Sequence, residues 1–293
     1  MKLIKQSFEI LDQQCGLEGI YKQIEISGRT CYKSEDKITE DSAKEFVDRI
    51  IKSGHGAMLE HGTVYLAMPV ETILPIEANG WGKYTKNPYS KGFKVYNVNG
   101  QKRVAITTNL RVLVENGWLD DLQYICEPTE YHEKRITVKF TTDQGILREF
   151  TRHRVFSFAV ESTRYCNYTK DKFSNEITFI QPNWISDKDI ENYHMDFGYF
   201  TDQDTNHITA VNRFMSALKN AEYFYMELIK LGWKPQQARN ILPLATKCDM
   251  VMTGFVSDWK HFFALRDAAS AHPQAQELAH SLHEAFIQRG LVE

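Results

Sequence analysis

Several features that mark common functional classes are missing from this 293-residue sequence. Its five cysteines are an odd number, scattered along the chain without a C-x-x-C pair. Because metal and redox cysteines need close spacing, and disulfide frameworks belong mainly to small secreted domains, we expect neither. No glycine-rich loop matches a Rossmann or a Walker phosphate-binding pattern. A nucleotide site, if there is one, must be built in another way.

A strong excess of charge and long apolar runs are also absent. The chain has 35 basic and 38 acidic residues, a formal net charge of −3, so its overall charge does not favour nucleic-acid binding. The opening MKLIKQSFEILDQ carries Glu9 and Asp12 too early for a signal peptide, and no apolar run approaches membrane-spanning length. We therefore expect a reduced, cytoplasmic, globular protein with no membrane or nucleic-acid partner.

Periodicity predicts an α+β fold, a mostly antiparallel sheet flanked by helices. We expect one domain over residues 1–293 with an insertion at about 71–135. Apolar residues over 3–11 suggest an opening strand, followed by a helix ending near Gly28. The next predicted helix, TEDSAKEFVDRIIKSG, is capped by Thr39 or Asp41 and closed by Gly54. A strand should begin at Thr63.

The insertion has its own local signals. NGWGKYTKNPYSKGF is expected to be an ordered loop, and Asn99-Gly100 between two β-rich runs predicts a hairpin. NLRVLVENG predicts a short helix with Gly117 as its stop, and RITVKFTT predicts a strand. The C-terminal third predicts a helix from Asn206 to Gly232, one between Pro235 and Pro243, an alternating strand TKCDMVMTGF, and two last helices, SDWKHFFALR and PQAQELAHSLHEAFIQRG.

The stretch TRHRVFSFAVESTRY, residues 151–165, combines cations with apolar residues in an unusual way. Planar guanidinium groups can bind phosphate bidentately, and nearby glutamates could hold them in place. The alternative is an interlocked Arg–Glu surface network. Phe156 and Phe158 are most simply core residues that fix the spacing. The arginines of the stretch are Arg152, Arg154 and Arg164, and Arg148 just before it adds to the cluster. The glutamates that could hold them are Glu149 and Glu161.

Two other chemistries are not supported by spacing. Ser162 and His153 suggest a hydrolase, but there is no G-x-S-x-G elbow and no obvious orienting acid. His55, Glu60 and His61 cannot share one helical face as H-E-x-x-H requires, so no metal is expected. These histidines are instead structural, or face a ligand from a loop.

Arg266 is the most informative single residue. In SDWKHFFALR the apolar stripe that includes Trp259 and Phe263 reaches position 266, where leucine would be expected. Arginine on a buried face is costly unless an anion pairs with its fork. Three arrangements would satisfy this arginine: a buried ion pair with a carboxylate such as Asp267 or Glu277, a snorkelling stem, or contact with a ligand.

In the stretch 151–165, R-H-R is followed by seven residues, then Ser and T-R-Y. This pattern resembles the signature of the flavin-dependent thymidylate synthases, the family unrelated to the cysteine-dependent enzyme. GHGAMLEH resembles its upstream G-H-x-x-x-x-E-H segment, QARNILP its A-R-x-x-L-P segment, and HFFALR its segment ending in the substrate-activating arginine. The segments stand in family order and cover most of the chain outside the insertion.

The resemblance implies a set of site residues. Arg266 would be catalytic, polarising the uracil of dUMP. The implied contacts to FAD are His55, Arg152, His153, Arg154 and His261. The implied contacts to dUMP are Glu149, Arg152, Glu161, Ser162, Thr163, Arg164, Arg239 and Arg266, with Ser162 to Arg164 and Arg239 at its phosphate.

The implied reaction is reductive methylation of dUMP to dTMP. Methylene-tetrahydrofolate would supply the carbon, FAD would carry hydride, and NADPH would be the reductant, in a homotetramer with shared active sites. The alternatives are a related flavoenzyme that acts on another pyrimidine nucleotide or transfers a different one-carbon group, and a non-catalytic nucleotide or RNA binder.

At three places in or near the implied pockets, the sequence departs from the pattern of the family. Val160 stands where relatives usually carry Gln or Glu, and Glu149 replaces a Gln seen in some members. Phe255-Val256-Ser257 does not match the Asn-Ala-Arg that contacts flavin in others. The resemblance is therefore closer in the phosphate pocket than in the flavin pocket.

Overall fold

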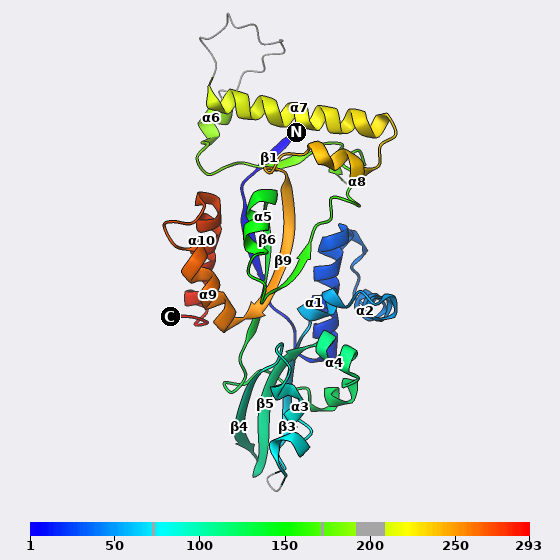
Figure 1. Cartoon of the computed structure of the whole chain (residues 1–293), viewed down its shortest axis with the longest axis vertical. Coiled ribbons are helices and arrows are strands. Elements are labelled where there is room, and N and C mark those ends of the chain that lie inside the picture. The colour runs from blue at the N-terminus through cyan, green and yellow to red at the C-terminus, as the bar shows by residue number, and fades with distance from the viewer. Residues whose placement is uncertain (72–73, 171–172, 192–208) are drawn as a thin grey trace, which may run out of the picture.

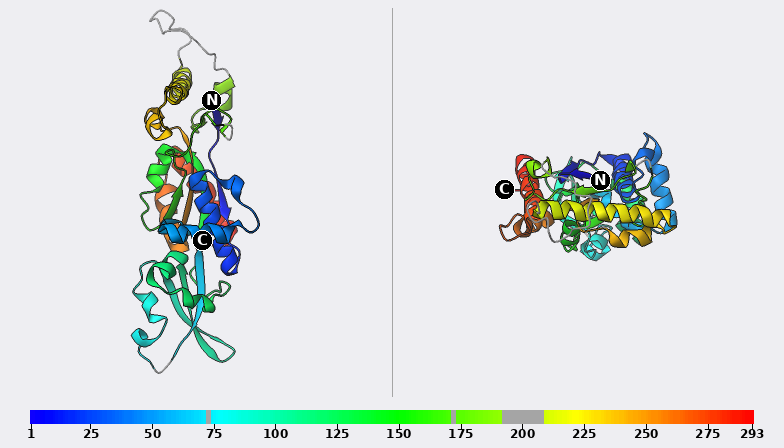
Figure 2. Two further views of the ribbon diagram at one scale, coloured as in Figure 1. Left: turned by 90° about the vertical axis from the view of Figure 1, so that its right-hand side faces the viewer. Right: turned by 90° about the horizontal axis from the view of Figure 1, so that it is seen from above.

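The computed structural model describes residues 1–71, 74–170, 173–191 and 209–293. The molecule is elongated, and three sheets follow one another along its long axis (Figures 1 and 2). A four-stranded sheet occupies the middle, a three-stranded sheet one end, and a two-stranded sheet with the long helix α7 (Ala210–Lys230) the other. Each of the three parts has a hydrophobic cluster of its own. In the described ranges no helix is both long and apolar enough to cross a membrane.

The central sheet is antiparallel throughout, with strand order β2-β6-β9-β7. Its strands are β2 (Ser7–Leu11), β6 (Arg135–Asp143), β7 (Ser157–Val160) and β9 (Lys247–Phe255). The prediction that β9 alternates is wrong, because eight of its nine residues are buried. This strand is covered on both faces, so neither set of its side chains faces water.

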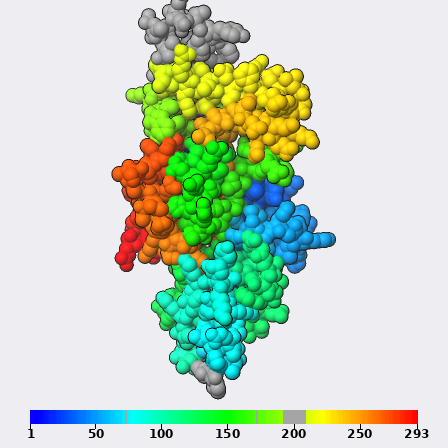
Figure 3. Space-filling view, viewed as in Figure 1, coloured from blue at the N-terminus to red at the C-terminus, as the bar shows by residue number. Residues whose placement is uncertain are grey.

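The helices α5, α9 and α10 pack against the central sheet, and α1 also contacts β7 and β9. Their bounds are α1 (Gly16–Tyr32), α5 (Gln144–Phe150), α9 (Val256–Arg266) and α10 (Pro273–Gln288). In the space-filling view α5 (green) lies at the surface between α9 and α10 (orange) on one side and α1 and α2 (Ser42–Ser53; blue) on the other (Figure 3). The helix that precedes the R-H-R motif is thus central and accessible.

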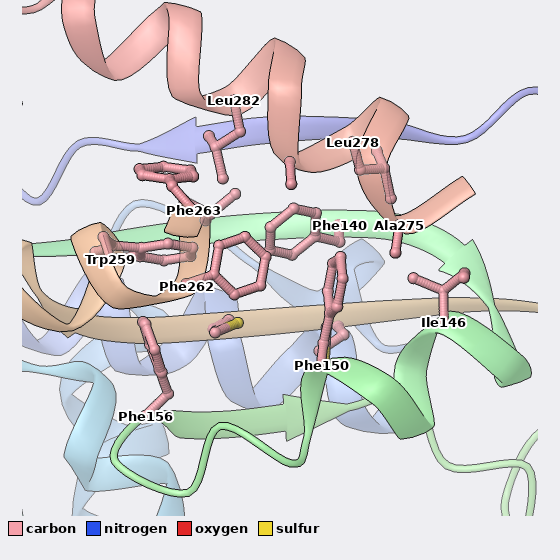
Figure 4. Close-up of a cluster of buried hydrophobic side chains, with 14 of the residues drawn as sticks. Phe140, Ile146, Phe150, Phe156, Trp259, Phe262, Phe263, Ala275, Leu278 and Leu282 are labelled. Carbon is pink, nitrogen blue, oxygen red and sulfur yellow. The ribbon is translucent and has the colours of Figure 1, made fainter. Parts of the chain in front are cut away.

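Aromatic rings join α5 and α9 to the sheet (Figure 4). Phe150 meets Phe262 edge-on with ring centroids 4.9 Å apart, and Phe156 meets Trp259 at 4.7 Å. Phe156 can enter because Gly254 lacks a Cβ, which would lie 2.4 Å from its ring. Phe156 is therefore a core residue, as expected, and anchors the end of the turn that carries R-H-R.

The first two helices differ from the predictions in where one ends and how the other is capped. Helix α1 does not end near Gly28 but continues to Tyr32, and Gly28 sits inside it because the Phe46 ring lies 2.5 Å from where a Cβ would be. Helix α2 (Ser42–Ser53) ends at Gly54 with a positive φ, as predicted. Its N-cap is Asp41, but neither predicted side chain caps it, and the Ser42 hydroxyl accepts from the Thr39 N–H instead. The 3-10 helices η1 (Glu35–Lys37) and η2 (Gly56–His61) flank α2.

The sheet at one end has strand order β3-β5-β4. The predicted hairpin is confirmed: Val98 pairs with Gln101, and Asn99 and Gly100 both have positive φ, as a two-residue turn requires. The helix stop at Gly117 is also confirmed, with φ 69°. The stretch expected to be a loop, residues 79–93, contains the short helix α3 and the first residues of β4, and the 3-10 helix η3 directly precedes it. The bounds are β3 (Thr63–Pro69), η3 (Ile76–Ala78), α3 (Gly82–Thr85), β4 (Lys91–Val98), β5 (Gln101–Asn109), α4 (Leu110–Asn116) and η4 (Leu119–Tyr124).

At the opposite end the opening segment is two strands rather than one. Strand β1 pairs in parallel with β8, whereas β2 joins the central sheet, so Lys5 and Gln6 connect two different sheets. Helix α7 is capped by the Thr209 side chain; positions 206–208 of its predicted span lie outside the described residues. The bounds are β1 (Lys2–Ile4), β8 (Thr178–Ile180), α6 (Asp187–Glu191), α7 (Ala210–Lys230), α8 (Pro235–Ala238) and η7 (Arg239–Ile241). Antiparallel sheets combined with helices confirm the predicted mixed α and β class.

Candidate functional site

Arg266 ends α9 and is held by two residues of the motif region. Its Nη1 donates to Glu149 Oε2 at 2.7 Å, its Nη2 to the Glu149 carbonyl at 2.8 Å, and its Nε to His153 Nε2 at 3.0 Å. Only 18% of its side chain is exposed. Neither Asp267 nor Glu277 is the partner, because Asp267 contacts His280 and His283 while Glu277 accepts from Gln6. The ion pair is formed instead with a carboxylate 117 residues away.

His153 is buried and neutral at pH 7. Burial lowers its pKa to about 4, and electrostatic interactions with Arg266 and His261 add to the effect. Its ring lies 5.1 Å from Phe262 and 6.3 Å from His261, centroid to centroid. Because Nε2 accepts the Arg266 hydrogen, the neutral ring carries its own proton on Nδ1.

A second group of predicted residues lines a pocket of about 320 Å³. Arg239 Nη1 donates to Thr163 Oγ1 at 3.1 Å within it. Gln144 and Arg148, four residues apart on α5, line the same pocket because that spacing places them on one helix face. Neither arginine forms an ion pair in the described part of the chain. Two guanidinium groups and a hydroxyl therefore face one small space, a donor set suited to phosphate.

Glu161 lies in a buried cluster of ions, with only 4% of the residue exposed. Its Oε2 accepts from Lys247 Nζ at 2.9 Å and from the Asp249 backbone N–H at 3.0 Å. Lys33, at the end of α1 with φ 49°, contacts Asp249 and lies 3.6 Å from Glu161. Burial opposes both charges, yet the two carboxylates raise the pKa of Lys33, and the two lysines lower the pKa of Asp249.

This ion cluster fixes the chain just before the predicted phosphate-binding residues. Directly after Glu161, the Ser162 N–H donates to the Cys31 carbonyl at 3.0 Å, so α1 also holds the loop. Sequence reasoning missed Lys33, Lys247 and Asp249 because they come from distant segments. The only local signal is the K-C-D pattern at 247–249, which places Lys247 and Asp249 on the same side of a strand.

The remaining predicted residues are exposed. Arg152 and Arg154 lie on the turn after α5, and their side chains have no hydrogen bond or ion pair within the ranges that the structure describes. The Arg164 guanidinium lies 5.6 Å from the Tyr165 ring centre. His55 stands at the start of η2, where no direct contact joins it to Arg266 or to Arg239 among the described residues. The structure thus brings predicted residues together in three groups, around Arg266, Arg239 and Glu161, and leaves these four side chains outside them.

His61 is structural rather than ligand-facing. It is fully buried, its Nδ1 lies 2.8 Å from Thr253 Oγ1, and burial together with Arg135 lowers its pKa to about 3. Glu60 is engaged by Arg111 Nη1 at 2.5 Å. Over the described ranges, no group of three or more His, Cys, Asp or Glu residues is arranged to hold a metal ion.

The family model of the thymidylate synthase complementing protein matches residues 128–289, which is more than half of the chain. The chain belongs to this family, that of the flavin-dependent thymidylate synthases. The match begins near the end of the predicted insertion and includes the R-H-R, A-R-x-x-L-P and terminal arginine segments. The GHGAMLEH segment lies before it.

Similar proteins include two flavin-dependent thymidylate synthases. The one from Halobacterium salinarum is 29% identical over 148 residues, which cover 50% of this chain and 59% of the relative. The one from Synechocystis sp. is 28% identical over 152 residues, which cover 52% of this chain and 66% of the relative. The match thus spans less than two thirds of the length of each relative.

Among solved structures, a UMP/dUMP methylase, PolB, from Streptomyces cacaoi bound with 5-Br dUMP aligns with a TM-score of 0.43. It is 17% identical, and the alignment covers 98% of this chain and 93% of the other. The same methylase bound with 5-Br UMP aligns with a TM-score of 0.44 at 16% identity, and this alignment covers 98% of this chain and 92% of the other.

Proposed function

We propose that the protein catalyses reductive methylation of dUMP to dTMP. In this proposal methylene-tetrahydrofolate is the carbon donor, FAD the hydride carrier and NADPH the reductant. One observation carries the proposal: helix α5 connects an anion pocket to a buried cation. Arg148 on α5 lines the pocket with Arg239, and the next residue, Glu149, holds Arg266. A nucleotide would use both features, because the pocket can bind its phosphate and the fixed charge of Arg266 can contact its base.

The chain's own residues have distinct tasks in this proposal. Thr163, Arg148 and Arg239 bind the phosphate, and Ser162 and Arg164 supply further donors from the same loop. Arg266 stabilises negative charge that develops on the uracil as carbon 5 becomes nucleophilic. A guanidinium suits this task because it stays charged when partly buried. No cysteine attack on the ring is required.

The cofactor residues fit an anionic dinucleotide. Arg152 and Arg154 are exposed without ion partners in the described chain, so both are available to a pyrophosphate. His153 and His261 lie beside them, and His55 would flank the flavin from η2. FAD, when bound, supplies hydride transfer; the residues named here bind and orient it.

We also propose that the protein is a homotetramer whose subunits share active sites. The absence of direct contacts between His55 and the Arg266 group in the described part of one chain supports this assembly. Light scattering on the purified protein should give about four times the 34.0 kDa mass of the chain. A stable monomer that forms dTMP would contradict it.

Colour is the first test of the proposed function. The purified protein, with FAD added if needed, should show flavin absorbance, and absence of bound flavin would rule out every flavoenzyme proposal. The second test measures NADPH oxidation and tritium release from uracil-labelled dUMP in the presence of methylene-tetrahydrofolate. Formation of dTMP is expected. A colourless protein that binds RNA would support the non-catalytic alternative.

A second candidate function is modification of another pyrimidine nucleotide. Val160 favours it, because this last residue of β7 packs against the central hydrophobic cluster and offers no polar side-chain contact where relatives usually carry Gln or Glu. Direct competition between UMP and dUMP in the tritium-release assay decides between the two. Preference for UMP, or flavin reduction without dTMP, would favour this second candidate.

A further inference from the structure

We propose that Glu149 and His153 are positioning residues that fix the plane of the Arg266 guanidinium. This inference rests on the proposed function, since it assigns these residues a task in activating the uracil. The resemblance places Glu149 at the nucleotide and His153 at the flavin, whereas the contacts in the structure direct both towards Arg266.

The hydrogen bonds account for most of the Arg266 donors. A guanidinium has five N–H groups. Three donate to an imidazole nitrogen, a carboxylate oxygen and a backbone carbonyl. One N–H on each terminal nitrogen is left without a partner among the described residues and can donate to a base. The three N–H groups that donate within the protein hold the guanidinium in place.

The groups that hold Arg266 are themselves fixed. The backbone N–H of His153 donates to the Phe150 carbonyl at 3.0 Å, and the His153 ring packs against Phe262. The second acceptor on Glu149 is a backbone carbonyl of α5, which cannot rotate away as a side chain can. Only one of the three contacts depends on a mobile carboxylate. This favours positioning over a blocking role, in which Glu149 would occupy Arg266 until a nucleotide displaces it.

Charge supports the same assignment. His153 faces Arg266 and His261 from α9, and the carboxylate of Glu149 on α5 is paired with Arg266. A protonated His153 would lose its acceptor and place a second cation against Arg266. The burial that keeps this ring neutral therefore also keeps its Nε2 available to the guanidinium.

The first experiment requires neither flavin nor nucleotide. In protein labelled with ¹⁵N-arginine, the Arg266 Nε–H signal, assigned by its loss in Arg266→Lys, should exchange slowly with water. His153→Phe, which keeps a ring of similar size, should abolish this protection, and His153→Gln, which keeps an acceptor, should restore part of it. The control is His280→Gln, an exposed histidine on α10. Fast exchange in the unaltered protein would overturn the proposal, even if the protein forms no dTMP.

The second experiment separates positioning from blocking and from general damage. Glu149→Gln and His153→Phe should each lower kcat about 10- to 100-fold, the usual effect of a small misplacement of a catalytic group. The Kd for dUMP should stay within about threefold because the phosphate pocket is intact. A rise in kcat for Glu149→Gln would establish blocking instead. Equal losses of Tm, bound flavin and kcat would show a purely structural role, and Glu284→Gln on α10 is the matched control.

Discussion

Arg266 illustrates how one residue can combine packing and chemistry. Its stem continues the stripe formed by Trp259, Phe262 and Phe263, which are all buried, while its fork reaches the end of α5. The neighbouring aromatic rings exclude water on one side, and this strengthens the electrostatic effect of the charge. The same burial makes the partner groups obligatory, because an unpaired cation there would be costly.

Replacing Arg266 tests its assigned role. Arg266→Ala and Arg266→Lys should both abolish detectable turnover, because lysine cannot reproduce a planar fork with three fixed hydrogen bonds. The fold and bound flavin should persist, as shown by circular dichroism and flavin absorbance. Near-normal turnover in either variant would remove Arg266 from the catalytic residues.

Glycines decide how closely the elements approach one another. In α1, a Cβ at Gly19 would lie 1.9 Å from the Gln14 carbonyl oxygen, and this is backbone that cannot turn aside. Gly19→Ala should therefore lower the free energy of unfolding by about 1–3 kcal/mol, although alanine is the better helix former. Urea unfolding measures the change. Gly80→Ala is the control, because the nearest atom to its added Cβ is a Met68 methyl at 3.9 Å; an equal loss there would contradict the explanation.

The buried ions connect three elements, α1, β7 and β9. Lys247→Met leaves Glu161 and Asp249 with one cation fewer, and should cost about 3–5 kcal/mol of unfolding free energy. Lys44→Met, which removes an exposed ion pair with Asp48, should change little. Both are measured by urea unfolding. A small effect of Lys247→Met would show that water or a shifted Lys33 compensates.

The whole molecule should lose stability in mild acid. His61 and His153 have folded pKa values of about 3 and about 4, below the ordinary 6.5. Below pH 6.5 the unfolded chain therefore binds more protons than the folded chain. The contribution of the two histidines to the free energy of unfolding is complete above that pH and decreases as the pH falls. At pH 5 the loss is about 2 kcal/mol for each histidine. The lowered pKa of Asp249 acts only below about pH 4 and does not contribute there.

Unfolding in urea at pH 7.5 and pH 5.0 measures this loss. Burial also lowers the pKa of His132, so this histidine adds to the same loss. His61→Gln removes one of the titrating groups and should reduce the difference between the two pH values by about 2 kcal/mol. An unchanged difference in that variant would show that other groups carry the acid sensitivity.

Much of the local structure was determined by the sequence itself. Helix stops at Gly54 and Gly117 and the turn at Asn99-Gly100 depend on positive φ, which few residue types adopt. The position of Arg266 on an apolar stripe follows from helical periodicity alone. The motifs that identified the family are likewise read along the chain.

Only the tertiary structure decided which distant groups meet. Arg266 pairs with Glu149 rather than with its neighbour Asp267, and Glu161 is surrounded by Lys33, Lys247 and Asp249. Periodicity shows which face of an element is apolar, but not which other element will cover it. Ion pairs depend on that choice, because a charge is satisfied by whichever opposite charge the packing brings within reach.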